Sequence, residues 1–333
     1  MKALRSHAVG GPETLVIDDI AQPVPAPGEV LIAVRACGIN FPDTLIIRDL
    51  YQYKPPRPFA PGAEVAGIIC ALGTGVTGFR IGDRVAAILV FGGLCEMVAV
   101  PADRVFALPD TVDFTHGAAM MLTFATSLHA LKDRAQLQPG ETLLVLGAAG
   151  GTGLSAVSLG KAMGARVVAA VSGADKAQAA LATGADETVI YGAPPFDREA
   201  SRALVAAFKS ACGPGGANVI YDPVGGDFAE PAMRAIGWQG RYLVIGFTAG
   251  IASLPLNLAL IKSADVRGVF YGEFMEREPA RNRALMAELF ALVAAEKAAP
   301  HICATLPLER AGEAIAMLAD RRAIGKVVVT LGS

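Results

Sequence analysis

The sequence has little charge and few aromatic side chains. Of its 333 residues, 18% are charged and 6% are aromatic, whereas 53% are hydrophobic, and the formal net charge is −2. An ordinary globular chain carries roughly 25% charged residues. The high hydrophobic content excludes an intrinsically disordered protein. A net charge near zero gives no electrostatic reason to expect a nucleic-acid partner.

Long hydrophobic runs are also missing. The closest candidate, residues 117–131, is shorter than the roughly 20 apolar residues that a membrane-spanning helix needs, and it contains Thr123, Ser127 and His129. The first residues, Met1 to His7, lack the apolar core of a signal peptide. We therefore expect no membrane partner. The apolar excess is expected in large cores, in a parallel sheet or in a subunit interface.

Paired cysteines and clustered histidines are absent as well. The five cysteines are odd in number and form no Cys-x-x-Cys pair, which argues against a disulfide framework and a zinc ribbon. Reduced thiols in the cytoplasm are the simplest interpretation. The four histidines are dispersed, so we interpret them as structural or surface residues. The chain also lacks the Gly-x-Ser-x-Gly motif of many serine hydrolases.

Short β-branched runs separated by glycine and proline turns dominate the first 115 residues. Closely spaced short strands of this kind predict a barrel-like antiparallel domain. The expected strands are residues 30–36, 64–69, 84–88 and 95–100.

From about residue 117 the pattern changes to alternating strands and helices, which predicts parallel βαβ units. The strands are continuous apolar runs, as expected for strands buried on both faces. The expected strands are residues 142–146, 166–171, 187–190, 217–221 and 240–245. After residue 266 we expect a strand, two helices and a last strand that return to the first domain.

The segment Leu144 to Leu154 contains a glycine-rich loop between an expected strand and an expected helix. Glycines let the backbone approach a pyrophosphate, and the helix N-terminus offers free N–H groups. A tight turn without a ligand is the alternative. We predict that this loop binds a dinucleotide through Ala149, Gly150, Gly151, Thr152 and Gly153.

The residues after the next strand indicate which dinucleotide is bound. NAD-binding chains place an acidic residue about 20 positions beyond the loop, where it holds the ribose 2′-hydroxyl. Here Ser172-Gly173-Ala174 occupies that place, and Lys176 follows in the first turn of a helix, where the helix dipole does not favour a cation. An ordinary solvated lysine is the alternative. We favour NADPH, with Ser172 and Lys176 at its 2′-phosphate.

Taken together, these motifs closely resemble the zinc-free quinone oxidoreductase (zeta-crystallin-like) branch of the medium-chain dehydrogenase/reductase superfamily. The resemblance covers nearly the whole chain. The segments that carry it are Pro27-Gly-Glu-Val-Leu-Ile, Gly38-Ile-Asn-Phe-Pro-Asp43, Pro61-Gly-Ala-Glu-Val-Ala-Gly67, Gly82-Asp-Arg-Val85, Ala148-Ala-Gly-Gly-Thr-Gly153 and Tyr221-Asp-Pro-Val-Gly225.

The resemblance implies an α/β chain with two domains. Residues 1–120 and 266–333 would form a GroES-like, partly open β-barrel catalytic domain. Residues 121–265 would form a Rossmann-type domain, a doubly wound parallel sheet that binds NADPH.

The zinc-dependent branch holds its catalytic metal with a cysteine and a Gly-His-Glu motif. Here Cys37 is present, but Gly62-Ala63-Glu64 carries alanine at the histidine position. One cysteine and one glutamate cannot build a tetrahedral zinc site. We therefore expect no metal, and hydride transfer then suits acceptors that are already electrophilic, such as quinones and activated alkenes.

The resemblance also implies residues near the reacting atoms. We assign Asn40, Asp43 and Tyr51 to the catalytic site, with Asn40 also beside the nicotinamide. The alternative for Asn40 and Asp43 is a helix capping box; for Tyr51 it is a packed aromatic. The family often has a second tyrosine two residues after the aspartate, where this chain has Leu45, which argues against a two-tyrosine acid mechanism.

Further cofactor contacts follow from the same resemblance. Thr126 matches a threonine at the nicotinamide edge, and Tyr191 matches a tyrosine on the adenine-side phosphate. Strand ends that flank the nicotinamide are matched by Gly246, Phe247, Phe270 and Tyr271. A backbone-bonded threonine and ordinary packed aromatics are the alternatives.

These observations predict an NADPH-dependent reductase of quinones or α,β-unsaturated carbonyl compounds. Two alternatives stay open: a reductase of acyl-CoA thioesters such as acrylyl-CoA, and a crystallin-like protein that binds NADPH without turnover. The resemblance further implies a homodimer formed by extending the dinucleotide-domain sheet. We expect its edge in the apolar residues 250–261, which include Leu254, Leu256, Leu258 and Leu260.

Overall fold

The computed structural model describes residues 1–332, which divide into two compact units. The first unit combines residues 1–123 with the chain from residue 300 onward, and the second unit is residues 124–299. The chain returns to the first unit later than the expected residue 266. The reason is that β13 (Asp265–Gly268) pairs in parallel with β12 (Ile236–Val244) and so extends the sheet of the second unit.

The first unit is built around one long strand, β3 (Glu29–Ile39), in the part of the chain that the structure describes. One side of β3 pairs along its length with β4; on the other, its first half pairs with β6 and its last residues with β15. All pairings in this sheet are antiparallel except that of β14 with β15. The remaining strands are β1 (Lys2–Ser6), β2 (Leu15–Asp19), β4 (Glu64–Leu72), β5 (Arg84–Ile88), β6 (Met97–Pro101), β7 (Val105–Ala107), β14 (Ile302–Pro307) and β15 (Lys326–Thr330).

Sharing one strand among three partners curves this sheet, which confirms the expected barrel-like, GroES-like architecture. Alternate residues of β3, Val30, Ile32 and Val34, point into one apolar core, as the period of two for a strand requires. Three helices accompany the sheet: α1 (Phe41–Ile46), α2 (Phe114–Met120) and α11 (Ala311–Ala319).

The second unit contains a parallel sheet whose described strands lie in the order β10-β9-β8-β11-β12-β13. Numbered along the chain from β8, this order is 3-2-1-4-5-6, which is the Rossmann order, so the expected fold is confirmed. The strands not yet defined are β8 (Thr142–Val145), β9 (Arg166–Val171), β10 (Glu187–Ile190) and β11 (Ala217–Asp222). Residues 167–171 of β9 are all buried, as expected for a strand covered on both faces.

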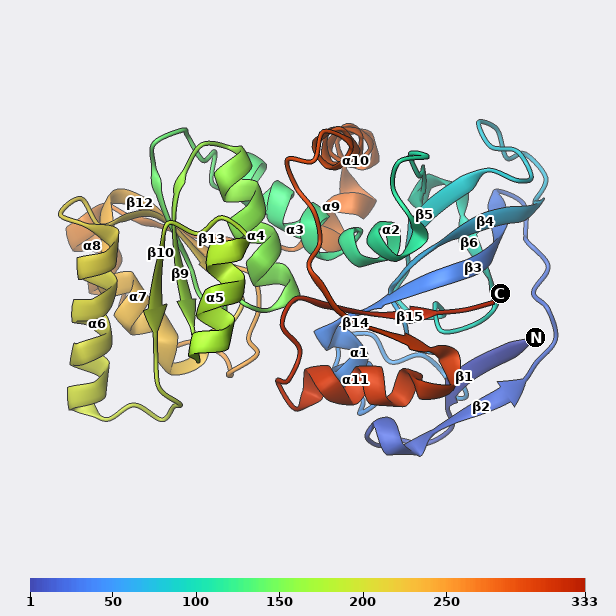
Figure 1. The fold of residues 1–333 in the computed structure, drawn as a ribbon, viewed down its shortest axis with the longest axis horizontal. Coiled ribbons are helices and arrows are strands. Elements are labelled where there is room, and N and C mark those ends of the chain that lie inside the picture. Colours follow the sequence, from blue (N-terminus) through green and yellow to red (C-terminus); the bar gives the residue numbers. More distant parts are fainter. Residues whose placement is uncertain (333) are drawn as a thin grey trace. The chain divides into compact units, whose positions relative to one another are not determined.

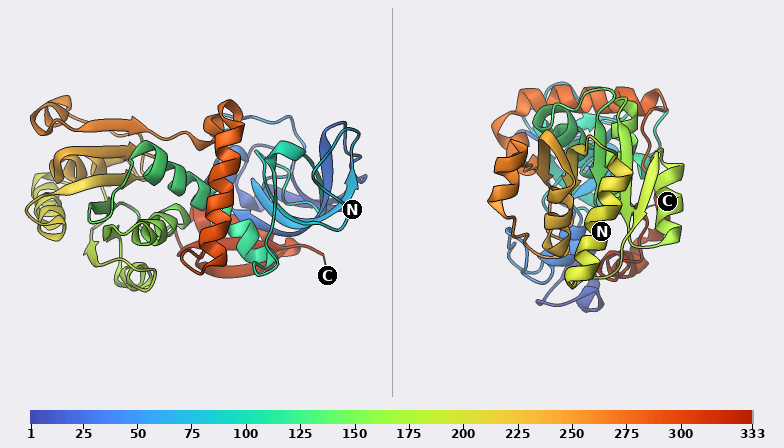
Figure 2. Two further views of the ribbon diagram at one scale, coloured as in Figure 1. Left: turned by 90° about the horizontal axis from the view of Figure 1, so that it is seen from above. Right: turned by 90° about the vertical axis from the view of Figure 1, so that its left-hand side faces the viewer.

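Helices cover both faces of this sheet. Figure 1 shows α4 and α5 on one face and α6 and α7 on the other. Figure 2 shows α10 as one long, straight helix. The helices are α3 (Thr123–Leu128), which continues into a π-helical turn over His129–Arg134, α4 (Gly151–Ala162), α5 (Ala174–Ala182), α6 (Arg198–Cys212), α7 (Ala229–Arg234), α8 (Leu256–Lys262), α9 (Tyr271–Arg277) and α10 (Pro279–Ala294).

The expected sheet edge at residues 250–261 is wrong. Residues 256–262 form the helix α8, and the edge strand is β13. The leucines of this stretch recur at every second residue. This spacing is typical of a strand, but a short helix with one buried turn can show it too. Leu258 is 5% exposed and packs into the core, whereas Leu256 and Leu260, one helical turn apart, are 76% and 80% exposed.

None of the helices that the structure describes is long and apolar enough to span a membrane.

Candidate functional site

The glycine-rich loop lies where the sequence predicts it, between β8 and α4. The helix begins at Gly151, and its N-cap residue is Gly150, which has no side chain with which to cap the first N–H groups. A Cβ on Gly153 would lie 2.3 Å from the carbonyl oxygen of Gly147 and 2.7 Å from the Cα of Ala148. Only glycine permits this close approach of helix and loop. The turn thus presents backbone N–H groups that have no partner within the helix, as an anion-binding cradle requires.

Buried hydroxyl groups hold α4 in place behind this loop. The Ser127 hydroxyl, from α3, shares hydrogen bonds of 2.7 Å with the hydroxyls of Ser155 in α4 and Tyr221 in β11. Burial raises the pKa of Tyr221, so its phenol stays protonated. These bonds connect α3, α4 and β11, and they fix the position of α4, whose N-terminus forms the cradle.

Ser172 and Lys176 lie together at the carboxyl end of β9. The Lys176 ammonium donates a hydrogen bond of 3.0 Å to the Ser172 hydroxyl. Ser172 is exposed and Lys176 half-buried, so both polar ends reach solvent. The structure therefore places a hydroxyl and a cation side by side directly after β9, the strand that neighbours β8 and its glycine loop.

The loops after β10, β11 and β12 hold further predicted residues. Tyr191 follows β10 and packs against Phe228, with ring centroids 4.6 Å apart. The Asp222 carboxylate accepts hydrogen bonds from the N–H groups of Val224 and Gly225 at 2.7 and 2.8 Å, and from the phenol of Tyr242. This aspartate, which sequence reasoning missed as a loop organiser, fixes the turn at the end of β11.

Gly246 and Phe247 follow β12 at the same edge of the sheet. The backbone of Gly246 bonds to Asp222, and the Phe247 ring is half-exposed. Thr126 is half-buried in α3. Gly246 and Phe247 lie at the carboxyl side of a Rossmann sheet, where ligands bind in such folds.

Phe270 and Tyr271 are neighbours in the sequence but differ in their exposure to solvent. Phe270 is half-exposed at the start of α9, whereas Tyr271 is buried and its hydroxyl donates a hydrogen bond of 2.7 Å to Asn282 in α10. Since this hydroxyl is satisfied inside the unit, the contacts favour the packing alternative for Tyr271 over a cofactor contact.

In the first unit, Asn40 lies in a buried polar cluster with Glu64 and Lys326. Its amide nitrogen donates to Glu64 at 2.8 Å, and its amide oxygen accepts from the Lys326 ammonium at 2.7 Å. The ammonium and the Glu64 carboxylate form an ion pair of 2.6 Å. Sequence reasoning missed Lys326. The signal for it in the sequence is a charged residue directly before the apolar run Val327-Val328-Val329.

Asp43 is buried at the start of α1. Its carboxylate accepts hydrogen bonds of 2.8 Å from the N–H groups of Asn40 and Gly62. The first bond is the carboxylate half of the capping box that the motif allows. Burial raises the pKa of Asp43 to about 6, partly offset by these two hydrogen bonds. The contacts therefore assign Asp43 a role in fixing the loop and α1 around Asn40.

Tyr51 lies in the loop after α1, beside Tyr53, with ring centroids 6.1 Å apart. Its ring packs against the core of the first unit, and burial raises the pKa of its phenol. The phenol thus keeps its proton at neutral pH. Tyr53 is more exposed than Tyr51, at 47%.

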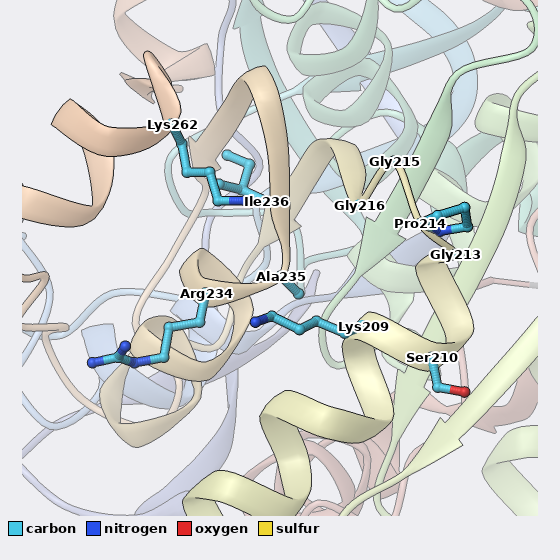
Figure 3. A pocket seen from close by; sticks show the side chains of 10 residues that line it. All are labelled: Lys209, Ser210, Gly213, Pro214, Gly215, Gly216, Arg234, Ala235, Ile236 and Lys262. Carbon is cyan, nitrogen blue, oxygen red and sulfur yellow. The ribbon is translucent and has the colours of Figure 1, made fainter.

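A pocket at the amino ends of the Rossmann strands, opposite the glycine cradle, is lined by three basic side chains, Lys209, Arg234 and Lys262 (Figure 3). Each belongs to the last turn of a helix, α6, α7 or α8, where a cation complements the helix dipole. The pocket precedes β11 and β12, whereas the glycine cradle follows β8. We assign these cations to the helix ends rather than to a ligand.

Comparison with known proteins gives both halves of the chain a family. Residues 26–110 match the family "Alcohol dehydrogenase GroES-like domain", and residues 151–290 match "Zinc-binding dehydrogenase". Among curated relatives, quinone oxidoreductase-like protein 2 of Mus musculus is 34% identical over 96% of this chain and 89% of its own length. Quinone oxidoreductase of Sus scrofa is 31% identical over 99% of this chain and 98% of its own.

A solved structure shares the whole architecture. The Escherichia coli quinone oxidoreductase, in complex with NADPH, superposes with a TM-score of 0.90 at 29% identity, covering 99% of this chain and 100% of that chain. The fold and these relatives define an oxidoreductase of the medium-chain dehydrogenase/reductase superfamily. Within it, the chain belongs to the quinone oxidoreductase branch.

One matched family is described as zinc-binding, but the residues here do not fit a zinc ion. Glu64 is committed to the Lys326 ammonium, and burial raises the pKa of the Cys37 thiol well above its ordinary value. Ala63 stands at the position of a histidine ligand. Across the described residues, no group of three or more His, Cys, Asp or Glu could hold a metal ion. These side chains therefore do not form a zinc site.

Proposed function

We propose that this protein is an NADPH-dependent reductase of quinones or α,β-unsaturated carbonyl compounds. The observation that carries the proposal is the glycine cradle at α4 together with the Ser172–Lys176 pair that follows the neighbouring strand β9. The quinone oxidoreductase names of the relatives and the NADPH complex of the Escherichia coli structure support it.

The first part of the proposal concerns the cofactor. The N-terminus of α4 would hold the pyrophosphate through the backbone of residues 150–153, because free N–H groups and the positive end of the helix dipole favour an anion. Lys176 and Ser172 would hold the 2′-phosphate. A cation and a hydroxyl suit that group, whereas an acidic residue there would repel it.

The second part concerns the chemistry. When bound, the cofactor supplies a hydride. Among the chain's own residues, Tyr51 keeps its phenolic proton at neutral pH and would give it, directly or through water, to the reduced acceptor. Glu64 is committed to Lys326, and Ala63 stands where a zinc site would have histidine, so these residues offer no metal site to polarise the acceptor and the proposal is limited to acceptors that are already electrophilic. Quinones and activated alkenes meet this requirement.

We also propose a homodimer that joins the sheets of two copies along β13. Among the strands that the structure describes, β13 is the last of its sheet and pairs only with β12. Exposed apolar residues are frequent in the part of the sequence that contains both strands. They are Trp238, Phe247, Ile251, Leu256, Leu260, Ile261, Val266 and Phe270.

The test is turnover by purified protein. We expect the protein to oxidise NADPH with members of a panel of quinones, enones and enoyl-CoA esters. The loss of nicotinamide absorbance measures this oxidation. Turnover restricted to the CoA esters would instead select the thioester reductase. Tight NADPH binding without turnover of any member would select a non-catalytic binding protein and overturn the proposal.

A further inference from the structure

The first residues of two strands flank the end of β3 in the first unit. β15 begins with Lys326 and β4 begins with Glu64, and both strands pair with the last residues of β3, immediately before Asn40. The side chain of Lys326 is 3% exposed and that of Glu64 is fully buried. The topology thus brings a buried cation and a buried anion to the side chain of Asn40.

The Lys326 ammonium has three N–H donors, and all three are used. They donate to the backbone oxygen of Ile39 at 2.9 Å, to the amide oxygen of Asn40 at 2.7 Å and to Glu64 at 2.6 Å. A fully used ammonium does not bind a ligand directly. Lys326 can therefore influence a reaction only through the groups that it holds.

Asn40 receives its orientation from this pair. Its amide nitrogen donates to Glu64 at 2.8 Å and to the backbone oxygen of Gly38 at 3.3 Å. A flipped amide would turn its NH₂ group toward the ammonium and its oxygen toward the carboxylate, and both contacts would be repulsive. The ion pair thus permits one of the two amide orientations.

The carboxylate of the pair is itself held in place. The second oxygen of Glu64 accepts a hydrogen bond of 2.7 Å from the backbone N–H of Leu122. A Cβ on Gly38 would lie 2.4 Å from Glu64 and 2.3 Å from the backbone oxygen of Ala118, so the glycine makes room for the carboxylate. Glu64 cannot move away to accommodate a flipped amide.

We infer that Lys326 is a positioning residue, which acts with Glu64 to present Asn40 as a hydrogen-bond acceptor only. Both amide hydrogens are used inside the cluster, so the amide oxygen is the only polar side-chain atom through which Asn40 can meet a ligand. Asn40 then accepts a hydrogen bond from a hydroxyl or N–H group of the cofactor or substrate, and it does not donate one to a developing oxyanion. The inference rests on the proposed function, which makes Asn40 a ligand contact.

The test variant replaces both charges at once, as Lys326→Met with Glu64→Gln. Removing one partner alone would leave a buried, uncompensated charge and endanger folding, whereas the neutral pair keeps the approximate shape. A glutamine can turn its own amide to match either orientation of Asn40. The matched control is Lys161→Met with Asp186→Asn, which removes an ion pair of 2.8 Å on the surface of the second unit.

The first readout does not depend on activity. The chain contains four asparagines, so labelling with ¹⁵N-asparagine resolves the Asn40 side-chain amide by nuclear magnetic resonance. We expect its hydrogens to exchange with solvent at least about tenfold faster in the double variant, and unchanged in the control. Unchanged exchange in the double variant overturns the inference.

The second readout is a kinetic cycle. Asn40→Ala should lower kcat in the natural background, and in the double-variant background its further effect should shrink to less than about threefold, because the orientation is already lost. Equal effects of Asn40→Ala in both backgrounds show that Lys326 acts independently and overturn the inference. If the natural protein turns over no acceptor, the proposed function fails and the exchange measurement alone decides about Lys326.

Discussion

At the scale of single residues, Lys176 distinguishes the two nicotinamide cofactors. Lys176→Ala should weaken NADPH binding by about tenfold or more, because a charge-assisted hydrogen bond to the 2′-phosphate is lost. NADH lacks that phosphate, so its binding should change little. Titration of nicotinamide fluorescence gives both dissociation constants.

Lys209→Ala is the control for this experiment. It removes an exposed lysine near the end of α6, in the pocket at the amino ends of the strands of the same sheet. We expect it to leave both dissociation constants unchanged. Equal weakening of NADPH and NADH by Lys176→Ala would disprove the 2′-phosphate role.

Asp43 gives a prediction about pH. Its pKa in the folded protein is about 6, above its ordinary value of 3.8. The folded state therefore binds the proton more tightly than the unfolded state. The stability that this group contributes is fully present below about pH 4 and is lost as the pH rises through about 6, by on the order of 3 kcal/mol.

Asp43→Asn isolates this contribution, because an amide does not titrate in that range. Denaturant unfolding of both proteins from pH 4 to pH 7 should show the free energy of unfolding of the natural protein falling relative to that of the variant. A constant difference between them across this range would contradict the raised pKa.

How far the sequence predicts such residues depends on how local their contacts are. Asn40 and Asp43 lie three positions apart, so their motif reveals both the helix start and the hydrogen bond between them. Lys326 is 286 positions from Asn40, and the pairing of β15 with β3 alone brings the two together. No local pattern contains that information.

At the scale of elements, the turn between β8 and α4 separates two roles of glycine. A Cβ on Gly153 would collide with the backbone of Gly147 and Ala148, whereas one on Gly150 would meet its nearest atom at an ordinary 3.5 Å. Gly153→Ala should therefore lower the free energy of unfolding by about 1–3 kcal/mol even without cofactor. Thermal and denaturant unfolding measure this.

Gly150→Ala is the matched comparison. We expect it to unfold like the natural protein without cofactor, yet to bind NADPH more weakly, since the added methyl group would keep the pyrophosphate away from the backbone. If Gly153→Ala proved as stable as Gly150→Ala, the close approach of α4 to the loop would be refuted.

The sequence predicted the parallel sheet because most of its strands are continuous apolar runs that alternate with helices between clear turns. The same reasoning failed at residues 250–261. Leucines spaced by two residues fit both a strand and a short helix. The structure shows a helix, α8, in which Leu258 is buried, and the sequence pattern alone does not distinguish the two. Short amphipathic segments are therefore the elements that the sequence defines least.

At the scale of the whole molecule, the scarcity of charge now has a structural account. Part of the apolar excess lies in the doubly covered strands of the second unit, and part lies in the core around β3. A further part is exposed around β12, α8 and β13, where a monomer has no partner for it. This last part is what a subunit interface would cover.

The proposed dimer can be tested at this surface. Analytical ultracentrifugation should give twice the monomer mass for the natural protein, and Val266→Lys should give the monomer mass, because a lysine on β13 blocks edge-to-edge pairing.

The one tryptophan of the chain, Trp238, is 66% exposed on β12, the neighbour of β13. Its fluorescence should therefore shift to longer wavelength in the variant. Ile81→Lys, at a 67% exposed position of the first unit, should leave both readouts unchanged. A natural protein that sediments as a monomer at all concentrations would rule out the dimer.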